Sequence, residues 1–244
     1  MAKIFDLDSP LMRFLSKMAD LMILNVITIV GCIPVITAGA SITGMHYVLL
    51  KMARGEEAYI VKDWWKSFKQ NFRQATIIWV FFLAVFVLLA FDYRIYTRSG
   101  IDFPKVLMIL TGVAGIIVFI VYLYIFPILA RFSNSIRNIV KNSFFMSIIA
   151  FPKTICMAII TAAPMIVLFV APATVFKLFP LYIMFVFSLP AYACALLYSP
   201  VFARFEPKEE KKENPSEELS DEEYEEVSDI LKSEDVVDKG IDKE

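Results

Sequence analysis

Apolar residues run through most of this chain in uninterrupted stretches of membrane-spanning length. The first extends from Leu21 to Leu50, thirty positions without an Asp, Glu, Lys or Arg side chain. A helix needs roughly 20 apolar residues to cross the hydrocarbon core of a bilayer, which is about 30 Å thick. Four later stretches reach or approach this length: Thr76–Phe91, Val106–Ala130, Thr154–Phe176 and Leu178–Ala203. The pattern predicts an all-α fold, a polytopic transmembrane helical bundle.

The first apolar stretch is too long to be one pass. As a single straight helix it would extend about 45 Å at 1.5 Å per residue, so it would cross a bilayer only with extreme tilt. Pro34 lacks a backbone donor and Gly39 tolerates a turn, and both lie near the middle. We therefore predict a pass over Asp20–Ile36, a tight turn over Thr37–Ala40 and a short return pass over Ser41–Met52.

Basic side chains gather in two of the connections between apolar stretches. One connection holds Lys51, Arg54, Lys62, Lys66, Lys69 and Arg73, and the other holds Arg131, Arg137, Lys141 and Lys153. Connections rich in Lys and Arg stay in the cytoplasm, so both are expected there. About six passes with both termini cytoplasmic satisfy this distribution. The alternative is a five-pass topology in which Ser41–Met52 does not cross.

The balanced net charge of the chain conceals two regions of opposite sign. Residues 1–205 carry 18 Lys or Arg against 8 Asp or Glu, whereas residues 206–244 carry 6 against 17. A segment with few apolar residues and high net charge cannot bury enough surface to offset the entropy of ordering. We predict a transmembrane domain over 1–205 and an acidic, mostly disordered cytoplasmic tail over 206–244.

The first basic connection has the pattern of an interfacial helix. Aromatic residues repeat every four positions on one face, at Trp64, Phe68 and Phe72. Basic residues line another face, at Lys62, Lys66, Lys69 and Arg73. Such a helix can lie at the headgroup boundary with its cations against anionic lipid. The alternative function is docking of a cytoplasmic partner.

A few polar side chains interrupt the apolar stretches, and they are the candidate functional positions inside the membrane: Asn25, Thr28, Thr37 and His46. Asn25 and Thr28 share one helix face, where hydrogen bonds between helices are expected, and the alternative is a path for a polar solute. His46, the only histidine, fits a packed, hydrogen-bonded residue better than a catalyst. The sequence shows no phosphate-binding loop, metal-ligand spacing or nucleophile motif. We therefore expect no catalytic residue, no cofactor, no metal and no nucleic-acid partner.

Several segments together form a recognisable pattern: Asn25, the runs at 34–41, 47–57 and 68–76, and the later runs at 126–132 and 141–143. In these segments the chain resembles the YesL family of bacterial integral membrane proteins, and the resemblance covers roughly residues 1–205. Members of that family have no established biochemical activity, and their genes typically lie beside those of ABC-type carbohydrate importers. The resemblance implies a multi-pass protein of the bacterial cytoplasmic membrane that acts as an accessory or regulatory component of sugar uptake, with importer subunits or their regulators as partners. A transporter or channel for a small polar solute is the alternative.

Overall fold

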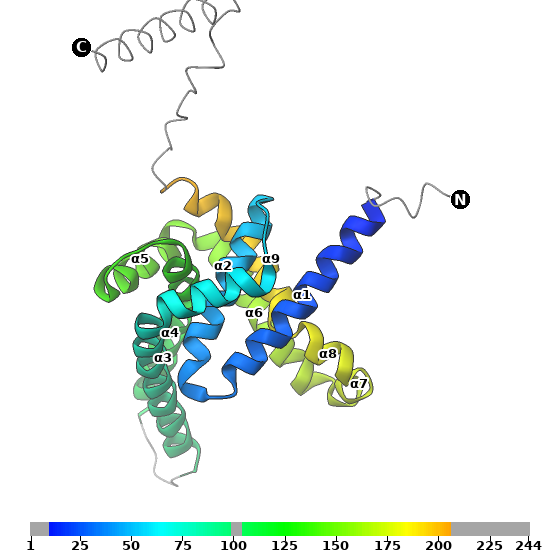
Figure 1. Ribbon diagram of the computed structural model, residues 1–244. Helices are drawn as coiled ribbons and strands as arrows, with labels where there is room; N and C mark the ends of the chain where they lie inside the picture. Colours follow the sequence, from blue (N-terminus) through cyan, green and yellow to red (C-terminus); the bar gives the residue numbers. More distant parts are fainter. Residues whose placement is uncertain (1–9, 99–103, 206–244) are drawn as a thin grey trace, which may run out of the picture. The chain divides into compact units, whose positions relative to one another are not determined.

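The computed structural model describes residues 10–98 and 104–205, and within them every regular element is a helix (Figure 1). The predicted tail over 206–244 lies outside the described residues. The elements are α1 (Pro10–Cys32), η2 (Val35–Thr37), α2 (Ala38–Arg54), α3 (Ile60–Arg98), α4 (Lys105–Arg131), α5 (Ile136–Ile149), α6 (Phe151–Val170), α7 (Pro172–Lys177), α8 (Phe179–Phe185) and α9 (Ser188–Phe202).

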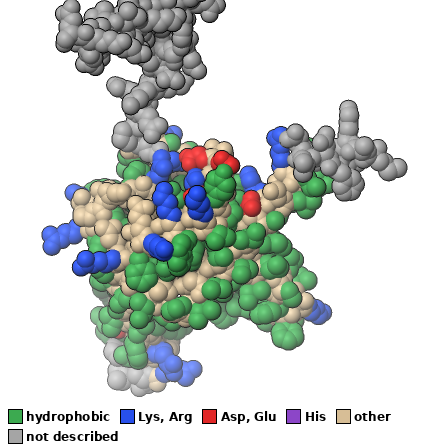
Figure 2. All heavy atoms as spheres, in the orientation of Figure 1, with side chains coloured by type: hydrophobic (Ala, Val, Ile, Leu, Met, Phe, Trp, Pro, Cys, Tyr) green, Lys and Arg blue, Asp and Glu red, His purple; other side chains and the backbone are tan. Residues whose placement is uncertain are grey.

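Five helical segments are long and apolar enough to cross a membrane: α1, α3, α4, α6, and α8 taken together with α9. This confirms the predicted class, an all-helical membrane protein. Large apolar side chains are exposed along all five segments, for example Val30, Phe81 and Phe169. Figure 2 shows many of these hydrophobic side chains gathered over the middle and lower part of the face in view. Side chains that would be unfavourable in water are therefore suited to contact lipid.

The first hairpin turns earlier than predicted. Helix α1 ends at Cys32, the chain reverses through η2, and α2 already begins at Ala38, so the expected turn over Thr37–Ala40 lies mostly inside α2. Pro34 precedes the 3-10 helix, and Thr37 stabilises the reversal by donating its hydroxyl to the carbonyls of Gly31 and Pro34. The number of passes stays a prediction, because α2 is a 17-residue helix and is not among the five span-length segments.

Helix α2 lies at the centre of the bundle, between α1, α3, α4 and α9. Eleven of its seventeen residues are buried. Its first turns are made of small residues, including Gly39, Ala40 and Gly44, so neighbouring helices can approach its backbone closely. It ends at Gly55, whose φ of 73° is the left-handed conformation that glycine adopts without a steric cost.

The predicted interfacial helix and the span that follows it form one continuous helix, α3, of 39 residues. Figure 1 shows that this helix changes direction: its first part, in cyan, crosses in front of α2, and the rest descends beside α4. The sequence anticipated both parts but placed a boundary between them. An amphipathic segment can pass directly into an apolar span because each of its residues keeps the same backbone hydrogen bonds.

Prolines divide the last part of the bundle into shorter helices. The predicted span Thr154–Phe176 ends as α6 at Val170, just before Pro172 begins α7. The predicted span Leu178–Ala203 is interrupted at residues 186 and 187, between α8 and α9. Pro190 accounts for this interruption, because a proline cannot donate to the carbonyl four residues earlier and its ring clashes with it.

Candidate functional site

Asn25 fills the interruption between α8 and α9. Its side-chain oxygen accepts hydrogen bonds from the backbone N–H groups of Phe187, at 3.0 Å, and Ser188, at 2.9 Å. Its side-chain nitrogen donates to the carbonyl of Ile183 at 2.7 Å. One fully buried side-chain amide of α1 thus provides hydrogen-bond partners for backbone groups at the end of α8 and at the beginning of α9.

Thr28 and Ser41 join α1 to α2 through the backbone. The Ser41 hydroxyl donates to the carbonyl of Thr28 at 2.7 Å, while the Thr28 hydroxyl donates to Leu24 within its own helix. Of the predicted pair on the α1 face, only Asn25 therefore uses its side chain to reach another helix. Both hydroxyls are buried, so their hydrogen bonds remove the cost of placing them in an apolar interior.

His46 is paired with a residue 152 positions away. Its Nδ1 lies 3.0 Å from the hydroxyl of Tyr198 on α9, and the two rings meet edge to face with centroids 6.1 Å apart. Tyr198 is completely buried. This hydrogen bond links α2 to α9 as Asn25 links α1 to the same helix.

Trp64 is buried at the crossing of α2 and α3, so it does not face the headgroup boundary as the sequence suggested. Its indole nitrogen donates to the Ser41 carbonyl at 3.2 Å, and its ring covers Gly44 and Gly31. A Cβ added at either glycine would lie within 3.0 Å of this ring. The sequence pattern placed Trp64 on the face shared with Phe68 and Phe72, but Gly44 on α2 and Gly31 on α1 leave room for its ring between the helices.

An ion pair holds the end of α2 against the beginning of α3. Lys51 donates to the carboxylate of Asp63 at 2.8 Å, and the same carboxylate accepts the backbone N–H of Tyr59 at 3.0 Å. Asp63 therefore acts as a local cap for α3 and a link to α2.

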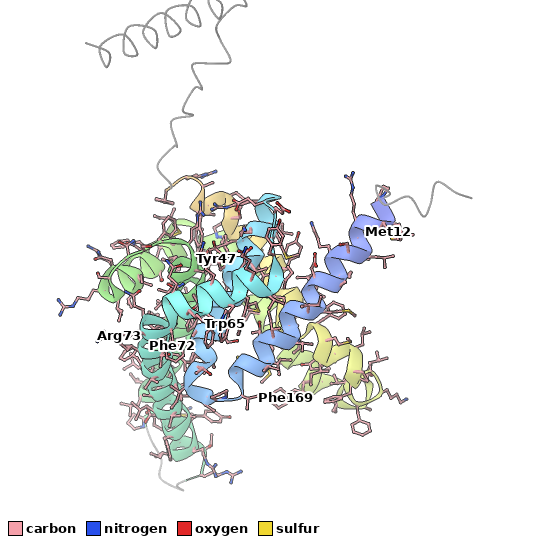
Figure 3. All side chains as sticks on the ribbon, viewed as in Figure 1. Met12, Tyr47, Trp65, Phe72, Arg73 and Phe169 are labelled. Carbon is pink, nitrogen blue, oxygen red and sulfur yellow. The ribbon has the colours of Figure 1, made fainter. Side chains whose placement is uncertain are left out.

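The remaining predicted residues on α3 face outward. Lys62, Lys66, Lys69, Phe72 and Arg73 are exposed, and Phe68 is partly buried. Figure 3 shows Trp65, Phe72 and Arg73 along the first part of this helix. Trp65, which the sequence pattern did not select, is 48% exposed and has the ammonium group of Lys69 at 4.9 Å from its ring centroid.

The sequence reasoning also missed several hydrogen bonds between distant parts of the chain. Tyr198 bonds His46, Trp79 donates to the carbonyl of Val35 at 2.7 Å, and Tyr124 pairs with Thr154 at 2.9 Å. Each pair joins residues far apart in the chain, so helical periodicity gives no sign of it. Among the described residues, no three His, Cys, Asp or Glu side chains come together in a group that could hold a metal ion.

A protein-family model described as "Protein of unknown function, DUF624", a family of bacterial membrane proteins, matches residues 21–93. The matched segment runs from the middle of α1 through α2 and most of α3. It therefore contains Asn25, the three glycines at the helix crossings and the outward basic face of α3. No curated protein and no solved structure matches the chain.

Proposed function

We propose that this protein is a non-enzymatic accessory or regulatory component of an ABC-type carbohydrate uptake system, as its resemblance to the YesL family implies. The observation that carries the proposal is the division of polar groups between interior and surface. Asn25, Ser41 and His46 are each hydrogen-bonded to another part of the bundle. Exposed basic side chains such as Lys66 on α3 and Lys141 on α5 lie on the surface instead, where another component of the membrane can reach them.

In this proposal the protein lies in the bacterial cytoplasmic membrane with both termini in the cytoplasm, and α2 is a short return pass. Basic side chains are frequent over the upper part of the molecule in Figure 2, the part that contains the first half of α3 and α5. The positive-inside rule assigns such an end to the cytoplasm. Single cysteines replacing the exposed residues Gln70 and Asn142 would then react only with reagents that enter the cell, and one replacing Arg98 would react from outside.

Co-purification tests the accessory function directly. The full chain, tagged and extracted from native membranes in mild detergent, is expected to enrich the subunits of a carbohydrate importer over an unrelated membrane protein of similar abundance. Deleting the chromosomal gene should lower uptake of the importer's sugar without changing importer abundance. Recovery of the protein without any importer subunit, together with unchanged uptake in the deletion strain, would reject the proposal.

The interrupted α8–α9 helix favours a second candidate function, a transporter or channel for a small polar solute. Discontinuous helices in transporters expose backbone groups that bind ions or substrates near the middle of the membrane. Here the N–H groups of Phe187 and Ser188, which the interruption leaves without helical partners, are already bonded to Asn25. Liposomes that contain only this protein would decide between the two functions, since the accessory protein is expected to transport no labelled oligosaccharide.

A further inference from the structure

Two amphipathic helices of this bundle carry the same arrangement of side chains on their outward surfaces. On α3, Lys69 lies over the ring of Trp65 at 4.9 Å from its centroid. On α5, Lys141 lies over the ring of Phe145 at 5.9 Å. Both aromatic side chains are about half exposed, at 48% and 49%. A cation held over an exposed aromatic ring four residues away therefore occurs twice.

The first part of α3 ends beside the connection that leads into α5. Gln74, just after this first part, donates its side-chain amide to the carbonyl of Asn134, in that connection, at 3.3 Å. Figure 1 shows the first part of α3 and α5 at a similar height in the picture. We name residues 62–73 of α3 and the whole of α5 the collar.

The collar is basic and apolar at once. Its exposed cations are Lys62, Lys66, Lys69, Arg73, Arg137 and Lys141. Its exposed apolar side chains include Phe72, Phe144, Ile148 and Ile149, which are 40–62% exposed. The one acidic residue in these two segments, Asp63, is buried against Lys51. No acidic side chain of the collar therefore competes for the outward cations.

We propose that the collar is a binding surface for anionic phospholipid headgroups. A helix of 14 residues is about 21 Å long at 1.5 Å per residue, too short for α5 to cross the hydrocarbon core. Its apolar face needs acyl chains and its cations need phosphate oxygens, and the two meet at the headgroup boundary. A wholly cytoplasmic protein partner would satisfy the cations but leave the apolar side chains at the edge of the spans unmatched. The inference does not depend on the accessory function.

Fluorescence quenching by brominated lipid tests this inference on the full chain in nanodiscs. The emission lost on Trp65→Phe separates the signal of Trp65, which reports on lipid at α3, from that of Trp64 and Trp79. The emission gained when Phe145→Trp is added to the Trp65→Phe background reports on α5. At equal mole fraction, brominated phosphatidylglycerol in unlabelled phosphatidylcholine should quench each reporter several-fold more than brominated phosphatidylcholine in unlabelled phosphatidylglycerol. Each Lys or Arg near an anionic membrane surface adds a binding free energy that corresponds to about fivefold in affinity. Lys69→Gln should therefore lower the preference for phosphatidylglycerol at Trp65 about fivefold, and Lys141→Gln should do the same at position 145.

Lys177→Gln supplies the matched control, since Lys177 is an exposed lysine at the end of α7 and not part of the collar. It should leave both preferences unchanged, and raising the salt concentration should weaken them in the wild-type protein. Equal quenching by the two lipids would overturn the inference, and so would a preference that neither lysine substitution lowers. A water-soluble quencher separates lipid from protein binding at Trp65. If acidic domains of an importer protected Trp65 from this quencher and phosphatidylglycerol did not, the collar would instead be a protein-docking surface.

Discussion

Helices α2 and α5 are similar in length but opposite in exposure. Helix α2 buries eleven of its seventeen residues, whereas α5 buries four of fourteen. Ser41 and His46 of α2 bond other helices, while the charged side chains of α5 face outward. The difference separates two kinds of polar group in one membrane protein: those inside fix the packing of helices, and those outside remain on the surface.

The largest effect should come from adding a single methyl group at Gly39, near the beginning of α2. A Cβ at Gly39 would lie 2.5 Å from the backbone oxygen of Ala75 and from the Cβ of Trp79, so α2 and α3 must separate. Gly39→Ala should lower the free energy of unfolding by about 3 kcal/mol, the upper range for overpacking. Titration with a denaturing detergent measures it.

Gly112→Ala is the matched control for this prediction. Nothing lies within 4 Å of a Cβ at Gly112, and alanine is about 1 kcal/mol better than glycine inside a helix. The control should be neutral or stabilising. Equal behaviour of the two variants would show that α2 is not closely packed.

Removing the amide of Asn25 should rank next. Asn25→Ala leaves two buried N–H groups and one carbonyl without partners at the α8–α9 interruption, at a cost of about 1 kcal/mol or more for each. We expect a total loss of about 2–3 kcal/mol by the same titration. Thr28→Val should cost much less, because the Thr28 hydroxyl bonds only its own helix. A larger loss from Thr28→Val than from Asn25→Ala would contradict the assignment of Asn25 as the link.

The pairing of His46 with Tyr198 should give a smaller, measurable coupling. Each of His46→Phe and Tyr198→Phe removes the hydrogen bond between α2 and α9, and the double variant has no more of this bond to lose. A double-mutant cycle should yield a coupling of about 1 kcal/mol. Additive effects would mean that the two side chains do not interact.

The smallest effect on stability should come from the collar. Lys69→Gln combined with Lys141→Gln alters exposed side chains and should change the free energy of unfolding by less than about 0.5 kcal/mol. A loss comparable with that of Asn25→Ala would assign these lysines to the scaffold and remove the distinction between α2 and α5.

The sequence alone predicts much of the fold, and what it does not predict has a physical cause. Long apolar stretches require helices in a bilayer, so the helical class and most spans follow from composition alone. The 3.6-residue period also identified an amphipathic segment at 62–73. The period of a helix cannot say which face packs inward, and for Trp64 the space left by Gly31 of α1 and Gly44 of α2 decides it. The links from Asn25 to α8 and from His46 to α9 join residues more than 150 positions apart, and no local pattern contains them.

Water accessibility at position 46 tests the central claim most directly. In a background lacking Cys32, Cys156 and Cys194, His46→Cys places a thiol at the helix-linking position of α2, and Gln70→Cys places one on the exposed surface of α3. If interior polarity serves packing, a membrane-impermeant thiol reagent should label position 70 in inside-out vesicles and leave position 46 unlabelled from either side. Labelling of position 46 at a rate similar to that of position 70 would mean that water reaches His46, and the interior would then be a path rather than a scaffold.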